Sequence, residues 1–158
     1  MIRRYTITGT PAVLKNSKQI IKIGGKPRLI PSAKARKAKE HAVAELKVQH
    51  TGEPIGQPIA VKFTFYGAWK IGAGNVPDLS NLLELPQDAM QAAGVIADDR
   101  LIESLDGTIR VCMCSTCDHR LKYVKGPKAG QYKPDCGSVK FCPFERTEIE
   151  ITGYSEKS

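Results

Sequence analysis

The chain has 158 residues, of which 41% are hydrophobic, and a formal net charge of +8 gives it a pI near 9.3. This length suits one domain with a single core, and no apolar run is long enough to span a membrane. No secretory signal is evident, so we expect a cytoplasmic protein rather than a membrane or secreted one. The excess of positive charge favours a polyanionic partner, because neutralising phosphates releases their condensed counterions.

The first thirty residues predict a strand and a hairpin. Residues 3–8 alternate in the way a half-buried strand does. Two shorter apolar runs, residues 20–23 and 28–30, flank the sequence Gly24-Gly25-Lys26-Pro27. Glycine and proline of this kind between apolar runs predict a hairpin turn.

Cationic side chains are concentrated in the first forty residues of the chain. Ser32 is a favoured N-cap residue and predicts a helix that runs to about Gln49. Lys34 and Lys37 would project outward from it, either to contact phosphate or as an ordinary solvated face. Nine basic residues make up the cluster: Lys15, Lys18, Lys22, Lys26, Arg28, Lys34, Arg36, Lys37 and Lys39.

A second, amphipathic helix is predicted between two groups of acidic residues. Asp78 precedes this helix, and the pair Asp98 and Asp99 follows its plausible stop at Gly94. Pro86 lies within the helix and should kink or split it, because proline removes a backbone donor. If the chain folds back so that the three carboxylates meet, they form a hard-cation site. The alternative is a helix cap followed by a solvated turn.

Further strands are expected at residues 60–66, 108–112 and 145–151. Together with the first strand they would form a small mixed β-sheet, and with two main helices the fold class is α+β. Glycine and proline clusters in the middle of the chain mark loops rather than a domain boundary. Residues 1–158 are therefore expected to form a single domain.

All five cysteines fall between positions 112 and 142, where disulfides are not expected in a cytoplasmic chain. A Cys-x-x-Cys pair is separated by eighteen residues from a Cys-x5-Cys pair, which favours a tetrahedral structural zinc site. Its ligands would be Cys114, Cys117, Cys136 and Cys142. Cys112 and His119 are alternative ligands, and unliganded thiols or a redox pair are alternatives to zinc. Because residues 118–140 are poor in apolar side chains, we expect residues 112–143 to be a zinc-ribbon-like insertion that folds around the metal.

The acidic segment also carries a family resemblance. Its order and spacing resemble the motif of the RusA family of Holliday junction resolvases, which are often phage-encoded. The N-terminal strand, the loop bearing Asn16, the basic helix and the closing strand also resemble this family, so that the resemblance covers residues 1 to about 111 and resumes at about 144. Three runs carry the motif: Asp78-Leu79-Ser80-Asn81-Leu82, Gln87-Asp88-Ala89-Met90 and Ile96-Ala97-Asp98-Asp99-Arg100.

The resemblance implies a homodimeric, magnesium-dependent endonuclease that resolves four-way DNA junctions in recombination and repair, in a bacterial or phage-infected cell. The metal-binding aspartates of the family match Asp78 and Asp99, with Asp98 as the adjoining acid. The basic segment would contact the branched DNA through Lys15, Asn16, Lys18, Lys34 and Lys37.

Two positions depart from the family pattern. Ser80 stands where the pattern has a second aspartate, and Glu84 stands where it has a catalytic lysine. Glu84 could restore the missing carboxylate, since residues four apart are neighbours on a helix, or it could be a solvated surface acid. Lys15 or Lys18 could replace the lysine.

Two functions therefore compete. In the first, Asp78, Asp98, Asp99 and Glu84 serve a magnesium-dependent, structure-selective endonuclease. In the second, the departures mark a site that no longer cleaves, and the chain is a zinc-stabilised DNA-binding protein.

Overall fold

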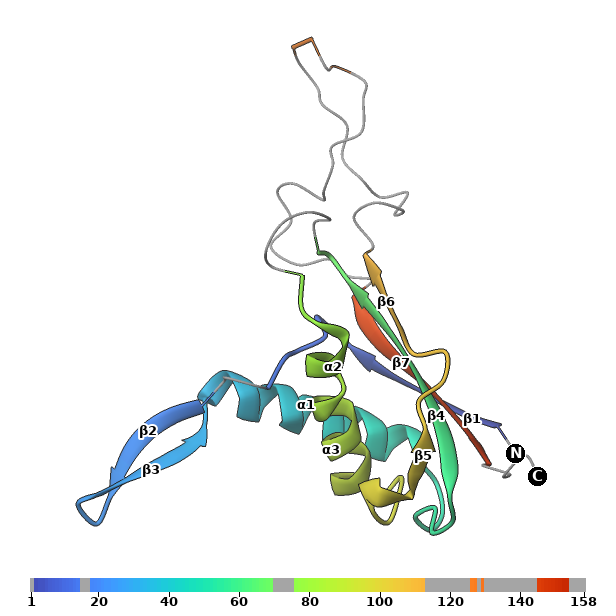
Figure 1. Ribbon diagram of the computed structural model, residues 1–158, viewed down its shortest axis with the longest axis horizontal. Helices are drawn as coiled ribbons and strands as arrows, with labels where there is room; N and C mark the ends of the chain where they lie inside the picture. Colours follow the sequence, from blue (N-terminus) through green and yellow to red (C-terminus); the bar gives the residue numbers. More distant parts are fainter. Residues whose placement is uncertain are drawn as a thin grey trace.

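The computed structural model describes residues 2–14, 18–69, 76–112, 126, 127, 129 and 145–153. A five-stranded sheet is covered on one face by helices, and a two-stranded hairpin projects from this body (Figure 1). The elements in chain order are β1 (Ile2–Thr8), β2 (Lys18–Ile23), β3 (Lys26–Pro31), α1 (Ala33–Gln49), β4 (Ile59–Gly67), α2 (Leu79–Leu82), α3 (Glu84–Ala92), the 3-10 helix η1 (Asp99–Leu101), β5 (Ile102–Ser104), β6 (Ile109–Cys112) and β7 (Arg146–Gly153).

The main sheet is mixed, which confirms the predicted α+β class. Its first three strands lie in the order β1-β7-β4 and are antiparallel. β5 and β6 both pair with β4 in parallel, β5 near the start of β4 and β6 near its end. The strands at residues 60–66, 108–112 and 145–151 were thus predicted to within about two residues, whereas the three-residue β5 was not expected.

Alternating side chains of the sheet form the core. On β4, Val61, Phe63 and Phe65 are almost completely buried, and Ile149 and Ile151 of β7 lie beside them. α1 contributes Ala42 and Leu46 to this core, and α3 contributes Ala89 and Met90. Because successive residues of a strand point to opposite faces, the other face of the sheet is left to polar side chains such as those of Lys62 and Glu150.

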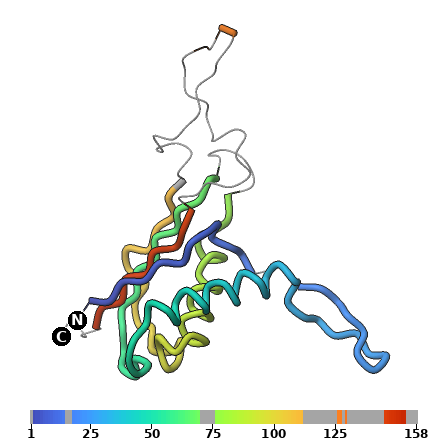
Figure 2. Tube along the Cα trace, turned by 180° about the vertical axis from the view of Figure 1, so that it is seen from behind, coloured from blue at the N-terminus to red at the C-terminus, as the bar shows by residue number. Residues whose placement is uncertain are grey.

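α1 begins as the sequence predicts. The Ser32 hydroxyl oxygen accepts a hydrogen bond from the Ala35 backbone N–H at 3.2 Å, the arrangement of a side-chain N-cap. The helix then runs along the free edge of β1 (Figure 2). There Gln49 accepts from the Thr6 N–H at 2.8 Å and donates to the Thr6 carbonyl at 2.7 Å, while Glu45 accepts from the Thr8 N–H.

The second helix is split into α2 and α3, as Pro86 predicts. The break falls at Leu83, three residues before the proline, because the proline ring would clash with the carbonyl four residues earlier in a continuous helix. α3 ends at Ala92, and Gly94 follows with φ +74°, so the predicted stop is confirmed.

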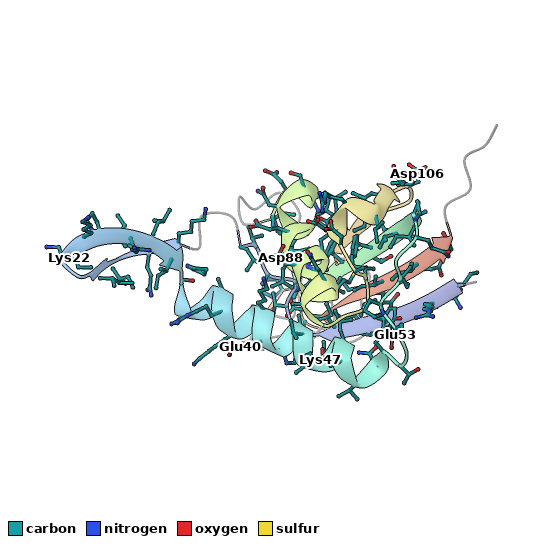
Figure 3. All side chains as sticks on the ribbon, turned by 90° about the horizontal axis from the view of Figure 1, so that it is seen from below. Lys22, Glu40, Lys47, Glu53, Asp88 and Asp106 are labelled. Carbon is teal, nitrogen blue, oxygen red and sulfur yellow. The ribbon has the colours of Figure 1, made fainter. Side chains whose placement is uncertain are left out.

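The predicted hairpin is β2–β3, and its turn is shorter than the sequence indicates. Only Gly24 and Gly25 form the turn, both at positive φ, since Lys26 already pairs with Ile23. The hairpin stands away from the body, and no residue of either strand belongs to the hydrophobic core (Figures 1 and 2). Figure 3 shows Lys22 far out on this arm.

Several expectations lie outside the described residues. They include the zinc ligands Cys114, Cys117, Cys136 and Cys142 and the DNA-binding residues Lys15 and Asn16. None of the helices within the described ranges is long and apolar enough to cross a membrane.

Candidate active site

Asp78 occupies the N-cap position of α2, but its side chain makes no capping hydrogen bond. The helix start is closed instead by the backbone, where the Asn81 N–H donates to the Asp78 carbonyl at 3.1 Å. The carboxylate is exposed to solvent. Asp78 thus has the position of a helix cap, as one interpretation predicts. Its side chain makes no capping bond and remains available to a metal ion, as the other interpretation requires.

A groove of about 360 Å³ is lined by Pro77, the residue before Asp78. Lys34, in the first turn of α1, and Pro77 both border it, so the structure brings one predicted DNA-binding residue to the acidic motif. The groove is lined by Thr10, Pro11, Ala12, Val13, Leu14, Lys34, Ala35, Trp69 and Pro77.

Glu145 holds the wall of this groove in place, a role that the sequence did not reveal. Its buried carboxylate accepts hydrogen bonds from the Thr10 hydroxyl at 2.6 Å and from the Ala68 N–H at 2.8 Å. Its backbone carbonyl accepts from the Gly9 N–H at 2.9 Å. A buried carboxylate is stable only when it is paired in this way, so Glu145 fastens the loop after β1 to the end of β4.

A cation, Arg110, contacts the residue before Asp78. Arg110 extends from β6, and its guanidinium donates a hydrogen bond to the carbonyl of Pro77, the residue before Asp78. Arg110 is exposed and forms no ion pair within the described ranges. Sequence reasoning missed this residue, because nothing in a single strand shows which distant loop its side chains reach.

Asp98 and Asp99 form the second acidic group, and the two residues differ. Asp98 caps η1 by accepting from the Arg100 N–H at 2.9 Å, and it also forms a two-pronged ion pair with the Arg100 guanidinium at 2.8 and 2.7 Å. These bonds hold the pKa of the Asp98 carboxyl well below its ordinary range. Asp99, the next residue, is exposed. Asp98 therefore matches the solvated-turn alternative more closely than a metal ligand.

The two acidic groups lie at opposite ends of the α2–α3 pair (Figure 1). The residue before Asp78 contacts Arg110, whose partner in the sheet is Phe65 of β4. Asp99 leads into β5, which pairs with β4 at Ile59. Phe65 and Ile59 are six residues apart on one strand, a distance of about 20 Å. Within the described residues, Asp78, Asp98 and Asp99 do not form a group of three that could hold a metal ion, so the expected cluster of three carboxylates is not met in one chain. That Asp78 and Asp99 share one ion stays a prediction.

Glu84 lies in a different groove, between α1 and α3. This groove of about 130 Å³ is also lined by Lys18, Arg36 and Lys39, so Glu84 shares it with three cations. One helical turn further on, Asp88 forms an ion pair with Lys39 at 3.0 Å. The side chains near Glu84 favour charge balance over metal binding. Lys18, predicted to contact DNA, lines this groove, whereas Lys37 is exposed on α1.

The side chains of one chain do not form a complete metal site in the part that the structure describes. No group of three or more His, Cys, Asp or Glu side chains is arranged to hold a metal ion there. The exposed carboxylates of Asp78 and Asp99 are nonetheless hard oxygen donors, which suit magnesium chemically. In the described part of the chain, neither aspartate belongs to a group of three or more potential metal ligands.

Comparison with known proteins identifies the family. A family model described as Endodeoxyribonuclease RusA matches residues 9–113, which include α1, the acidic motif and β6. The chain belongs to this family. No curated protein sequence matches it. RusA proteins are endodeoxyribonucleases, hydrolases that act on DNA phosphodiester bonds, so the predicted enzyme class is confirmed.

Proposed function

We propose that this RusA family member resolves four-way DNA junctions in recombination and repair, as a homodimer that depends on a divalent metal ion. The observation that carries the proposal is the exposed Asp78 carboxylate, which makes no capping bond and follows Pro77, a residue that lines the same groove as Lys34. An uncommitted acid whose neighbour in the chain shares a groove with a cation suits a site that must accept both a metal ion and a phosphate.

We propose further that the metal site forms between two protomers. Asp78 and Asp99 match the ligand positions of the family motif, yet Arg110 and Ile102, the strand residues near them, join β4 at Phe65 and Ile59, about 20 Å apart within one chain. In a dimer with two-fold symmetry, any contact between Asp78 of one protomer and Asp99 of the partner subunit occurs twice. Asp78 of one protomer and Asp99 of the partner subunit would then make two equal sites, one for each strand to be cut.

The residues around Asp78 have separate roles in this proposal. Asp78 and Asp99 would hold a divalent ion, which would supply charge stabilisation at the phosphate and an activated water. Lys34 attracts the phosphate backbone to the groove, and Glu145 keeps the groove wall in position. Asp98, bound to Arg100, fixes the turn that presents Asp99.

The projecting hairpin supports binding of a large polyanion. Its two strands and turn contain no acidic residue, while Lys18, Lys22, Lys26 and Arg28 are all exposed. Lys34 and Lys37, on the helix that follows the hairpin in the chain, are exposed as well. Such a surface suits the close-packed phosphates of a branched DNA.

Cleavage of a synthetic four-way junction with magnesium tests the activity. The wild-type protein should cut, and Asp78→Asn and Asp99→Asn should each abolish cutting while junction binding is kept. Glu40→Gln is the control for loss of one carboxylate, because Glu40 is exposed on α1 and belongs to neither acidic group (Figure 3). Cleavage by either aspartate variant would remove that residue from the site.

Mixed dimers test the shared site. An equal mixture of Asp78→Asn and Asp99→Asn chains forms dimers in which one site keeps both aspartates, so about one site in four is intact. Cleavage should therefore return on mixing, although neither variant cuts alone. A mixture that stays inactive after subunit exchange would place both ligands in one chain.

Glu84 and zinc are tested separately. If Glu84 replaces the missing acid, Glu84→Gln should slow cleavage and Ser80→Asp should partly restore it. If Glu84→Gln cleaves at the wild-type rate, Glu84 does not replace the missing acid.

For zinc, we propose one ion per chain, since four cysteine thiolates fill a tetrahedral structural site. Elemental analysis of protein purified without chelator should find it, and a zinc-free protein with reactive thiols would reject it.

A further inference from the structure

The acidic motif has no cation of its own. Between residues 76 and 99 the chain contains no lysine or arginine. The first cation after this stretch, Arg100, is committed to Asp98 by two hydrogen bonds from its guanidinium. Hydrolysis of a phosphodiester increases the negative charge on the phosphate oxygens in the transition state, and positioned cationic donors stabilise that charge. Such a donor must come from another element of the fold.

Arg110, on β6, has the position and the free donors that this requires. The hydrogen bond from its guanidinium to the Pro77 carbonyl places it one residue from Asp78. A guanidinium has five N–H donors in a planar fork, so a bond to one carbonyl leaves others for a phosphate. No carboxylate within the described ranges neutralises Arg110, which distinguishes it from Arg100 and from Arg4, the partner of Glu150.

The strand that carries Arg110 is firmly supported. β6 pairs with β4 from Ile109 to Cys112, and Arg110 is opposite the buried Phe65. Just before β6, the Thr108 hydroxyl accepts a hydrogen bond from the Phe63 N–H at 3.1 Å. Donors are effective in catalysis when they are held in place before the reaction, and a strand anchored to the core meets this requirement better than a loop does.

We propose that Arg110 is a catalytic residue that contacts the scissile phosphate beside Asp78 and stabilises the charge that builds up on its oxygens. The guanidinium stays protonated throughout and exchanges no proton with substrate or water. This inference rests on the proposed junction cleavage. It predicts that Arg110 acts on the rate of the bound complex more than on DNA affinity.

Single-turnover cleavage at saturating DNA and saturating magnesium tests the assignment. Arg110→Gln should slow cleavage about 100-fold, the usual effect of losing one transition-state donor, and change junction affinity only a few-fold. Arg110→Lys should recover part of the rate because it keeps the charge but loses the fork. Lys47→Gln removes one exposed charge from the outward face of α1 and should cut at the wild-type rate (Figure 3).

Other results would overturn the proposal. An Arg110→Gln rate equal to wild type would do so, as would a loss confined to DNA affinity. A defect that disappears at saturating magnesium would reduce Arg110 to a support for the Pro77–Asp78 backbone. If Arg110→Gln does not fold, Arg110→Lys decides alone: slower cleavage supports the role and wild-type cleavage overturns it. Failure of the wild-type protein to cut junctions would instead reject the proposed function itself.

Discussion

The three long strands of the main sheet, β1, β4 and β7, and the two strands of the β2–β3 hairpin are of comparable length, but only the sheet contributes to the hydrophobic core. On β4, Phe63 is fully buried, whereas Ile20 and Leu29, which face each other across the hairpin, are 72% and 61% exposed. Two strands without a third element to pack on are marginally stable in water. The body is thus stabilised by burial, while the arm depends on its own ladder, its turn and whatever it binds.

The largest contrast should be seen in stability. Phe63→Ala should lower the free energy of unfolding by about 3–5 kcal/mol, because it leaves a cavity in the core. Ile20→Ala should change it by no more than about 0.5 kcal/mol, since the side chain is exposed. Urea unfolding followed by circular dichroism measures both. Equal losses of unfolding free energy in the two variants would mean that Ile20 is buried against another surface.

For DNA affinity, substitutions on the hairpin should have a larger effect than substitutions on the body. Replacing Lys22 and Arg28 together by glutamine should weaken junction binding about tenfold and lower its salt dependence, because the arm then neutralises fewer phosphates and binding releases fewer counterions. Replacing the exposed Lys47 and Lys62 together is the matched control, with the same charge change on α1 and on the sheet. Fluorescence anisotropy across a salt series measures the difference. Similar weakening in both pairs would indicate net charge rather than the arm.

The hairpin turn should matter locally. Gly25 has φ +76°, a conformation that costs a side-chain-bearing residue about 1–2 kcal/mol, so Gly25→Ala should loosen the arm. Amide hydrogen exchange should quicken in β2 and β3 and stay unchanged in β4 and β7. Gly56→Ala, at a position with ordinary φ and open space, is the control. Faster amide exchange in β4 and β7 as well would show that the stability of the main sheet depends on the hairpin.

The smallest effect concerns the Asp98 and Arg100 pair. The depressed pKa of Asp98 means that the folded protein keeps this carboxylate charged at lower pH than the unfolded chain does. Its contribution to stability is present above its unfolded pKa and is lost as the pH falls through its folded pKa. In a carboxyl NMR titration, Arg100→Gln should raise the pKa toward its ordinary value. An unchanged midpoint would exclude the ion pair as the cause.

The sequence predicted the elements better than it predicted the site. The start of α1 at Ser32, the break caused by Pro86 and the hairpin depend on local preferences, which a single sequence carries. The parallel pairing of β6 with β4 depends on contacts between residues that are 45 positions apart, such as Phe65 and Arg110. That pairing brings Arg110 to Pro77, so this contact could not be predicted from spacing along the chain.

The two flanks of the main sheet limit how this protein can aggregate. Along β1, the amide of Gln49 and the carboxylate of Glu45 occupy backbone groups that a foreign strand would otherwise pair with. On the opposite flank, β5 and β6 are three and four residues long, and a turn with Gly107 at positive φ interrupts them. Short or covered edges are poor templates for strand addition. Extension of the sheet into a fibril is therefore hindered at both sides.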